Sequence, residues 1–357
     1  MKNRRTLLAR AALAVTALGV TGLAGLSLPA LAQSGDAVLN LYSARHYPTD
    51  QALYDNFTKT TGIKINIIQA DDAGIMERLR SEGASSPADV VMMVDAARLV
   101  LADDAGLFQP LKSKVLEERI PANLRAIDKG QGSTWYGLST RARIIVYNKI
   151  KVKPAQVATY ESLADPVNKG LVCTRSGSHP YNLSLFASMD QRLGAAKTEA
   201  WLKGVVANMA RDPKGGDTDQ IKAVASGECG VALTNSYYLA RLMNSKNPED
   251  IAVAEKVGVV FPDQQGLGTH QNIAGAALAR YAKHRDNAVK FMEYLSTPPA
   301  QIYFANGNNE YPAATGVKAS NPALEALGDF RRELIPLASI ASRTREVQQM
   351  LDRVGYK

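Results

Sequence analysis

The stretch VLNLYSARHYPTDQALYDNFTKTTGIKINII, residues 38–68, decides the fold class because it contains a strand, a helix and a second strand in direct succession. Residues 38–42 form a short apolar run that predicts a strand, and residues 63–68 predict another. Between them, residues 49–60 place apolar side chains on one side of a helix that Gly62 ends. This succession is typical of a parallel sheet covered by helices.

The alternation of short apolar runs and helical periodicity continues along the chain. Further strands are expected at residues 90–94, 144–147, 171–174, 230–234 and 257–261. Further helices are expected at residues 75–82, 96–103, 183–193, 198–208, 219–225, 286–295, 299–305 and 344–354. Because 357 residues exceed the length of one ordinary domain, this series predicts two α/β lobes.

Two segments join strand-like runs through turn-forming or polar residues, at 137–143 and 262–269, and we predict that both cross between the lobes. Two crossings make the first lobe discontinuous. The predicted organisation is lobe 1 at residues 36–138 and about 270–315, lobe 2 at residues 139–269, and a C-terminal helical segment at residues 316–357 that the sequence assigns to neither lobe.

Residues 1–32 have the three parts of a secretory signal peptide. A basic start is followed by an apolar stretch from Ala11 to Leu28 and by the small-x-small cleavage site Ala30-Leu31-Ala32. A membrane anchor is the alternative, but several glycines and Pro29 interrupt the apolar stretch, so we predict export and cleavage after Ala32. Arg4-Arg5 favours the twin-arginine export route over two ordinary charges.

Charge and motifs exclude several classes of function. The net charge is +8, but half of it comes from Lys2, Arg4, Arg5 and Arg10, and the remaining excess forms no basic stripe, which excludes nucleic-acid binding. After residue 32 the sequence has no G-x-S-x-G, H-E-x-x-H, Walker A or G-x-G-x-x-G pattern, so the common hydrolase, metalloprotease and nucleotide-binding signatures are missing. Two cysteines and four scattered histidines are too few for a cysteine-based zinc cluster or a catalytic triad.

Tyrosine is unusually frequent, with 14 Tyr against 7 Phe, and three loops that contain tyrosine follow predicted strands. These loops are residues 45–48, 179–182 and 235–238. Ligands of open α/β sheets bind at the carboxyl ends of the strands, so we expect the loops of both lobes to converge on the cleft between them. The side chains that would meet there are His46, Tyr47, Tyr181, Tyr237 and Tyr238.

Several phenols in one place indicate a hard and highly charged cation. A phenol has a free pKa of about 10, so only a strong Lewis acid holds several phenolates near neutral pH. Ferric iron fits best, because softer divalent ions recruit His and Cys, and calcium or magnesium recruits carboxylates and carbonyls. Four phenolates leave the complex with one net negative charge, which Arg141, Arg143 or Arg241 would offset. Spacing alone leaves the alternative open that each tyrosine is a half-buried packing residue.

Seven segments together resemble a known family, the periplasmic ferric-iron-binding proteins of ABC iron importers, and most closely its cyanobacterial type. The segments are LYSARHYPTD (41–50), ADVVMMVDAARL (88–99), STRARIIVYNK (139–149), SHPYN (178–182), GVALTNSYYLARL (230–242), and HQNIAGAALARYAKHRDNAVKFMEYL (270–295) with NNEYPA (308–313). The resemblance covers essentially the whole chain after the signal peptide. It implies the type II solute-binding fold, in which two α/β lobes are joined by crossing hinge strands with the ligand cleft between them.

The resemblance also implies the site and the function. The family's iron-binding tyrosines match Tyr47, Tyr181, Tyr237 and Tyr238, and His46 matches a position that is an additional ligand in some members. Arg141 and Arg241 are the candidates for charge compensation, and a structural role is expected for Glu310 and Tyr311.

The implied protein is a periplasmic monomer that catalyses nothing. It is exported by the twin-arginine machinery, captures Fe³⁺ as its transported ligand and hands it to an inner-membrane ABC permease. One alternative is a protein of the same fold that binds an organic, polyamine-like cation in an aromatic box. A further alternative is a secreted enzyme with an unrecognised site.

Cys173 and Cys229 precede the Tyr181 loop and the Tyr237-Tyr238 loop, respectively. If their strands are neighbours, a disulfide braces the two loops, and an exported location permits one. Two buried free thiols are the alternative, and the sequence leaves both open because it does not give the Cα separation.

Overall fold

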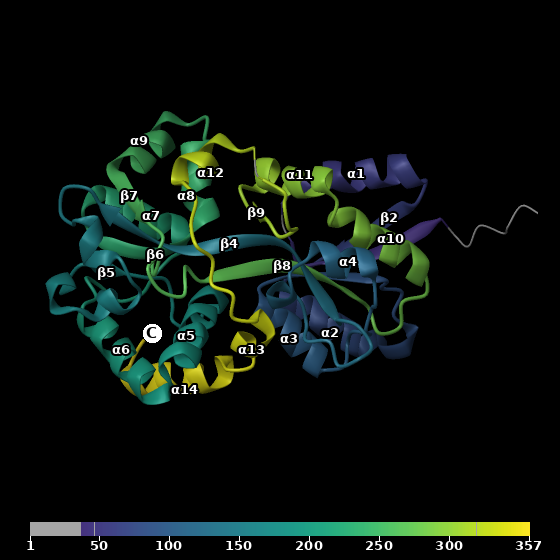
Figure 1. The fold of residues 1–357 in the computed structure, drawn as a ribbon, viewed down its shortest axis with the longest axis horizontal. Coiled ribbons are helices and arrows are strands. Elements are labelled where there is room, and N and C mark those ends of the chain that lie inside the picture. Colours follow the sequence, from purple (N-terminus) through teal and green to yellow (C-terminus); the bar gives the residue numbers. More distant parts are fainter. Residues whose placement is uncertain (1–36, 46, 319) are drawn as a thin grey trace, which may run out of the picture. The chain divides into compact units, whose positions relative to one another are not determined.

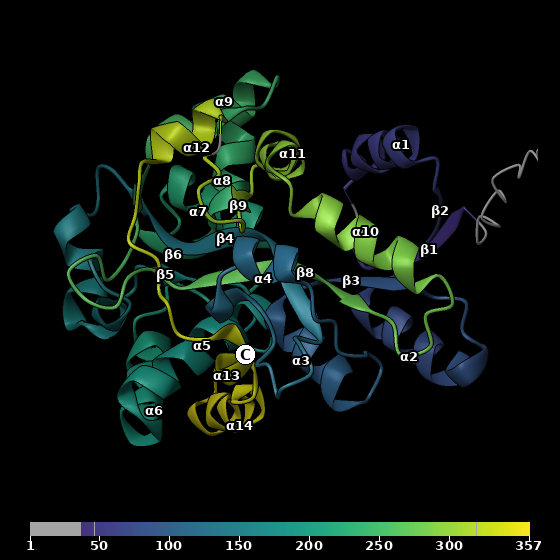
Figure 2. The same cartoon turned by 45° about the vertical axis from the view of Figure 1, so that its right-hand side comes forward.

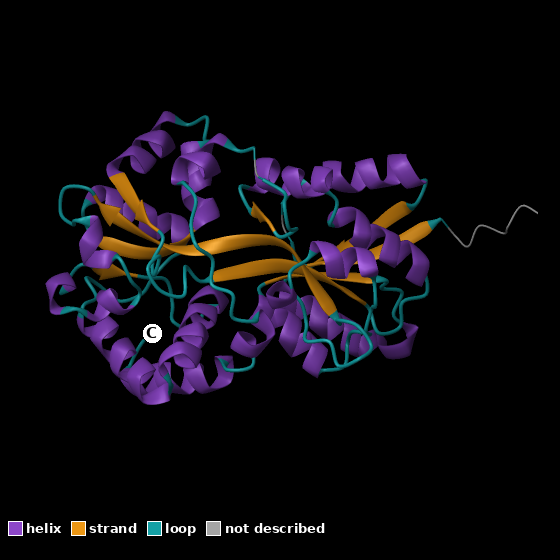
Figure 3. Ribbon diagram, in the orientation of Figure 1, coloured by secondary structure: helices purple, strands orange, loops and turns teal. Residues whose placement is uncertain are grey.

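A nine-stranded sheet forms the centre of the residues that the structure describes, and helices cover both of its faces (Figures 1 and 3). The structure is a computed structural model that describes residues 37–45, 47–318 and 320–357. The predicted signal peptide with its twin-arginine motif, and His46, lie outside these residues. The strands are β1 (Val38–Ser43), β2 (Lys64–Gln69), β3 (Val90–Val94), β4 (Trp135–Asn148), β5 (Val172–Cys173), β6 (Val231–Asn235), β7 (Val257–Val260), β8 (Gln271–Leu278) and β9 (Tyr311–Pro312).

The strand order within the sheet is β2, β1, β3, β8, β4, β6, β5, and both β7 and β9 also pair with β4. The first strand pairs in parallel with β2 and with β3, as the opening strand–helix–strand unit predicts. At the other end of the sheet, β5 and β6 are also parallel. The strands between these two parallel groups, β8 and β4, run antiparallel to their neighbours.

Helices fill most of the connections between strands. They are α1 (Asp50–Thr61), α2 (Asp72–Glu82), α3 (Ala96–Asp104), α4 (Lys114–Arg119), α5 (Pro180–Leu193), α6 (Ala195–Ala207), α7 (Asp217–Ser226), α8 (Ser236–Met243), α9 (Pro248–Lys256), α10 (Arg285–Leu295), α11 (Pro298–Asn308), α12 (Pro322–Leu327), α13 (Leu337–Ala341) and α14 (Thr344–Val354). Short 3₁₀ helices occupy Gly83–Ser85, Ala122–Leu124, Pro154–Val157, Glu161–Ala164 and Pro166–Asn168. Each predicted helix is confirmed, with bounds within three residues. Among the described residues, no helix is both long and apolar enough to cross a bilayer.

The strand predicted at residues 144–147 is far longer than expected, because β4 begins at Trp135. Its first half pairs with β8, and its second half pairs with β6 and β7. Residues 137–143, where we predicted a crossing between the lobes through turn-forming or polar residues, are continuous strand with one irregularity between Gly137 and Ser139. The sequence did not indicate a strand here, because nearly every residue of β4 is buried and the strand therefore lacks the alternation of a half-buried strand.

The chain segment after residue 316 packs beside elements that lie far earlier in the sequence. Helix α14 contacts α5 and α6, and α13 contacts α3 and α5. Figures 1 and 2 both show these yellow helices next to the teal α5 and α6. The C-terminal helices are therefore neighbours of the helix that begins at Pro180.

A disulfide joins Cys173 at the end of β5 to Cys229, two residues before β6. The two Cα atoms are 5.9 Å apart, and both residues are fully buried in a cluster with Ile144 and Val224. The parallel pairing of β5 with β6 brings the two cysteines together. The disulfide thus connects two strands that each lead directly into a loop containing tyrosine.

We expect the double substitution Cys173→Ser and Cys229→Ser to lower the free energy of unfolding. The cross-link closes a loop with a sequence separation of 56, for which loop-closure entropy corresponds to about 4 kcal/mol. Urea denaturation followed by circular dichroism measures this loss, with the reduced wild-type protein as the control. Equal unfolding midpoints for the variant and the oxidised wild type would contradict a disulfide-stabilised fold.

Candidate functional site

The four predicted tyrosines line one cavity of about 290 Å³. The other lining residues are Ala44, Asp71, Asp72, Val94, His179, Pro180 and Arg241. They come from the loop after β1, the start of α2, the end of β3, the start of α5 and the last turn of α8. The convergence predicted from the strand ends is therefore present for the tyrosines, and His46 lies outside the described residues.

Three of the tyrosines stand at the first turns of helices that follow strands. Tyr181 is the second residue of α5, after Pro180, whose fixed φ suits the first helical position. His179 caps this helix, and its Nδ1 accepts a hydrogen bond from the Tyr181 backbone N–H at 3.3 Å. Tyr237 and Tyr238 are the second and third residues of α8, which begins directly after β6.

The hydroxyl groups of Tyr181 and Tyr237 face each other, and the Tyr238 ring stacks on that of Tyr237. The Oη atoms of Tyr181 and Tyr237 are 3.2 Å apart. The rings of Tyr237 and Tyr238 stack with their centroids 4.2 Å apart and an angle of 29° between the planes. Tyr237 is buried and Tyr238 is half-buried, yet both line the cavity. Although Tyr237 and Tyr238 are neighbours on the helix, both of their rings therefore reach the cavity.

Arginine side chains lie over all four rings. The guanidinium carbon of Arg45 is 4.7 Å from the centroid of Tyr47, and those of Arg141 and Arg175 are 5.5 and 5.1 Å from that of Tyr181. Arg241 lies 5.6 and 5.5 Å from the centroids of Tyr237 and Tyr238. Arg141 and Arg241 were predicted near the site. Arg45 and Arg175 were not predicted there, although Arg45 begins the loop of residues 45–48 and Arg175 lies four residues before the loop of residues 179–182.

Arg143, which the sequence offered as a third charge-compensating residue, shares the Asp217 carboxylate with Arg175. Its Nη1 forms an ion pair with Asp217 at 2.6 Å, and its Nη2 donates to Asn182 Oδ1 at 2.6 Å. The sequence could not show these contacts, because the Asp217 carboxylate lies 74 residues away from Arg143.

Arg141 differs from Arg143 in having no hydrogen-bonded partner among the described residues. Its side chain is 1% exposed, and all three of its guanidinium nitrogens are buried without a hydrogen bond. The nearest carboxylate oxygen, of Glu310, is 4.0 Å away. Burial lowers the pKa of Arg141, but attraction to Tyr181, Glu310 and Asp95 outweighs it and raises the pKa above the ordinary value. Arg141 is therefore a buried permanent cation with free donors next to the tyrosines.

The phenols of Tyr47, Tyr181 and Tyr237 resist deprotonation near pH 7. Burial raises the pKa of Tyr47, Tyr181 and Tyr237 above the ordinary value near 10, and that of Tyr181 reaches about 12. Arg141 opposes this shift at each of the three residues. Deprotonation of these phenols near neutral pH consequently requires a cation stronger than the guanidinium groups alone.

A buried ion-pair network holds the loop of Tyr47. Arg45 Nε lies 2.7 Å from Asp50 Oδ2, and Arg45 Nη2 lies 3.2 Å from Glu310 Oε2, which also accepts a hydrogen bond from Ser139. Glu310 is fully buried, in agreement with the structural role expected for it. The network connects the first tyrosine loop to β4 and to the segment before β9.

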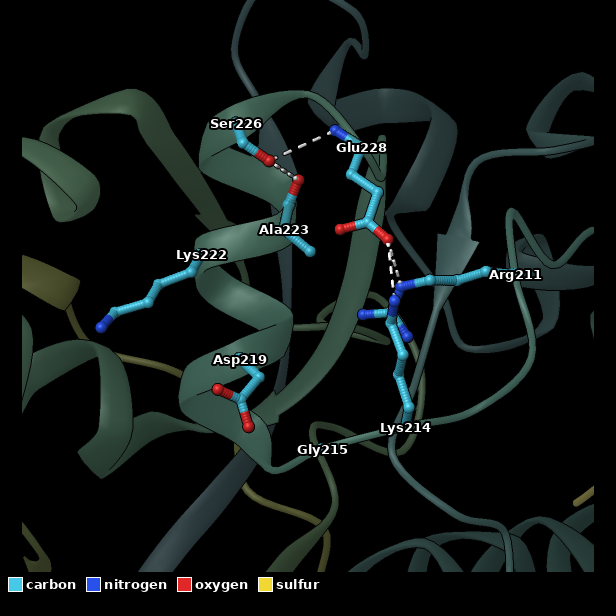
Figure 4. Close-up of a pocket in the computed structure, with 8 residues that line it drawn as sticks. All are labelled: Arg211, Lys214, Gly215, Asp219, Lys222, Ala223, Ser226 and Glu228. Carbon is cyan, nitrogen blue, oxygen red and sulfur yellow. Dashed lines mark hydrogen bonds and ion pairs between the residues drawn. The ribbon is translucent and has the colours of Figure 1, made fainter.

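Other features of the described residues do not compete as a metal site. No group of three or more His, Cys, Asp or Glu side chains in the described ranges is arranged to hold a metal ion. Figure 4 shows a larger cavity of about 510 Å³, in which Glu228 lies 2.8 Å from Arg211 and 3.4 Å from Lys214. Asp219 accepts the backbone N–H of Gly216. Most of the charges in this cavity therefore already have partners.

The mixed sheet, with a polar cavity at the strand ends, defines a solute-binding protein. The chain belongs to the family described as bacterial extracellular solute-binding protein, whose profile matches residues 52–330. It is 46% identical to iron uptake protein A1 of Synechocystis sp., over 89% of this chain and 87% of that protein. It is 42% identical to iron uptake protein A2 of the same organism, over 99% of both chains.

Among solved structures, the chain resembles the Trichodesmium protein IdiA (FutA) in complex with iron and citrate ligands. The TM-score is 0.86 and the identity 49%, over 90% of this chain and 100% of that chain. These comparisons confirm the two-lobed solute-binding fold and the resemblance to ferric-binding proteins. They also confirm that the chain is a binding protein and not an enzyme.

The His179 imidazole should stay neutral down to about pH 4. Its burial and the neighbouring charges of Arg175 and Arg143 lower its pKa to about 3. In an NMR titration of the iron-free protein, we expect the His179 Cε1–H resonance, assigned with a His179→Gln variant, to keep its shift between pH 8 and pH 5. A midpoint near the free value of about 6.5 would contradict this environment.

Proposed function

We propose that this protein binds ferric iron through Tyr47, Tyr181, Tyr237 and Tyr238 and delivers it to an inner-membrane ABC permease for uptake. The observation that carries the proposal is the convergence of the four phenols on one cavity, with the Tyr181 and Tyr237 hydroxyls 3.2 Å apart. The names of the relatives, which describe iron uptake proteins, support the same conclusion. His46 directly precedes Tyr47 and is the proposed additional ligand.

The charge balance of the site favours a trivalent ion. Binding replaces the phenol protons by the metal, so four phenolates and Fe³⁺ leave one net negative charge. Arg141 has three unpartnered guanidinium nitrogens among the described residues, and it offsets this charge without giving up an existing hydrogen bond. Arg241 and Arg175 contribute further positive charge beside the rings.

Ligands from both proposed lobes would couple binding to closure. Tyr47 belongs to proposed lobe 1, residues 36–138 with about 270–315, and the other three tyrosines belong to proposed lobe 2, residues 139–269. A metal that needs all four phenols binds best where the two sets meet, and so favours the closed conformation. The permease would then receive the loaded, closed form.

The cellular setting is part of the proposal. Residues 1–32 would direct export through the twin-arginine machinery and be removed after Ala32, leaving a periplasmic monomer. The relatives of this chain include periplasmic ferric-iron-binding proteins, for example one from Serratia marcescens that is 27% identical over 92% of this chain. Their location supports export of this chain.

The contacts of the rings disfavour an organic cation as the ligand. An aromatic box for such a cation presents free ring faces. Here arginine guanidinium groups already lie over the faces of all four rings. Tyr181 and Tyr237 present their hydroxyl groups to each other.

Titration of the protein lacking residues 1–32 with ferric citrate should produce a visible phenolate-to-ferric charge-transfer band that saturates at about one iron per chain. We expect Tyr237→Phe or Tyr238→Phe to weaken the band and to raise the Kd by at least about 100-fold, because each removes a ligand oxygen and keeps the ring. Tyr136→Phe is the matched control, since Tyr136 is a buried tyrosine that bonds to the Leu111 carbonyl outside the cavity. Absence of any band at saturating iron would overturn the ferric assignment.

Iron affinity should fall as the pH falls, because phenols with raised pKa values must release protons on binding. Each released proton changes the binding constant about tenfold per pH unit, so we expect a loss of at least about 100-fold between pH 8 and pH 6. Competition against a chelator of known pH dependence measures this slope. Tyr181→Phe should reduce the slope by about one proton, and an identical slope in this variant would contradict a Tyr181 phenolate ligand.

A further inference from the structure

The loop of residues 174–179 connects β5 to α5 and controls the surroundings of Tyr181. Arg175 in this loop lies over the Tyr181 ring at 5.1 Å. His179, at the end of the loop, caps α5 through the Tyr181 N–H, and its ring meets the Tyr181 ring edge-on with centroids 4.5 Å apart. The conformation of this short loop therefore decides where the Tyr181 hydroxyl lies.

One side of the loop of residues 174–179 is held by residues that lie between β5 and β6 in the sequence. Asn182 Nδ2 donates to the backbone carbonyls of Arg175 and Ser176 at 3.0 and 3.1 Å. The Arg175 side chain pairs with Asp217 at 3.2 Å. These contacts all come from residues between β5 and β6.

The other side of the loop is held by a residue that lies far away in sequence, Tyr356. Its hydroxyl oxygen is 2.7 Å from Thr174 Oγ1. Thr174 donates its single hydroxyl proton to the Arg175 carbonyl at 2.7 Å. The Tyr356 hydroxyl must therefore be the donor to Thr174, which places one directed chain of hydrogen bonds from Tyr356 to the backbone of Arg175.

Two further contacts fix Tyr356 against the same loop. The Gly177 backbone N–H donates to the Lys357 backbone carbonyl at 2.7 Å. The Tyr356 ring lies so close to Gly177 that a Cβ at this position would be 2.6 Å from Tyr356 Cδ1. Gly177 is thus required by a close approach of the ring to the loop backbone.

The path of the chain explains how Tyr356 reaches the loop. Helix α14 packs on α5 and α6, as Figures 1 and 2 show, and ends at Gly355, whose φ of 70° turns the chain. Tyr356 is 5% exposed, and its ring packs on Phe186 of α5 with centroids 5.3 Å apart. The ring alone serves packing, but the hydroxyl is directed at the loop and contributes nothing to the contact with Phe186.

We propose that Tyr356 is a positioning residue for the tyrosine site, which it serves by fixing the loop of residues 174–179 and, through it, Arg175 and Tyr181. The proposal rests on the proposed iron-binding function. Tyr356 touches neither the cavity lining nor the four tyrosines in any described contact, so its effect on binding is indirect.

The test uses Tyr356→Phe, which removes the hydroxyl and keeps the ring. We expect it to raise the Kd for ferric iron, measured in competition with citrate, by about threefold to tenfold, the factor that loss of one hydrogen bond supplies. We also expect a shift of the visible charge-transfer band. The control is Tyr136→Phe, which loses a buried 2.6 Å hydrogen bond to the Leu111 carbonyl and should lower the Tm while its Kd stays within about twofold of the wild type.

A double-mutant cycle shows whether the effect passes through Tyr181. In a Tyr181→Phe background, Tyr356→Phe should cause no further rise in the Kd. Gly177→Ala, which displaces the Tyr356 ring, should reproduce the effect of Tyr356→Phe on the Kd and on the band. If Tyr356→Phe lowers the Tm as the control does and leaves the Kd and the band unchanged, Tyr356 is only a packing residue and the proposal is wrong. If Tyr181→Phe itself leaves iron binding intact, the proposed function is what fails.

Discussion

The electrostatics of the cavity depend on two buried guanidinium groups, which belong to residues two positions apart on one strand. Arg141 and Arg143 stand on β4, and both are almost fully buried. A buried guanidinium is stable only beside anions or hydrogen-bond acceptors. Arg143 has them in Asp217 and Asn182, whereas Arg141 has only Glu310 at 4.0 Å and no hydrogen bond among the described residues. Negative charge on the neighbouring phenols would complete the surroundings of Arg141, and a bound trivalent cation creates that charge.

Two separate frameworks position the tyrosines around the cavity. The disulfide between Cys173 and Cys229 ties β5 to the start of β6, and the loops after these strands carry Tyr181 and the Tyr237-Tyr238 pair. Tyr47 depends instead on the ion pairs of Arg45, which is bound to the Glu310 carboxylate beside β4. The frameworks meet at β4, because this strand pairs with β6 at one end and with β8 at the other. A shift of either framework would separate the hydroxyls.

Local sequence patterns predicted what is local in the structure. The strand–helix–strand units and the tyrosines at their strand ends were predictable, because periodicity and the strand-end rule depend only on neighbouring residues. The full length of β4 and the strand β8 were not, since both are buried on each face and rich in small residues such as Gly275, and so show no alternation. The contacts of Arg143 with Asp217 and of Tyr356 with the loop of residues 174–179 could not be predicted from the sequence either. They arise from packing between distant segments, which leaves no spacing pattern in the sequence.

The preference for a hard cation follows from which donors around the cavity remain available. Both cysteine sulfurs of the chain are joined in a buried disulfide, so no thiolate is available for a soft metal. His179 uses Nδ1 to accept the Tyr181 N–H. The Asp71 carboxylate accepts a hydrogen bond from the Gly74 N–H, and the Asp72 carboxylate accepts one from the Val94 N–H. Each carboxylate therefore already bonds to a backbone N–H group. The Tyr181 and Tyr237 oxygens contact each other, and all four phenols line the cavity. Phenolates favour Fe³⁺ over softer divalent ions, so selectivity would come from presenting the tyrosines where no thiolate is available.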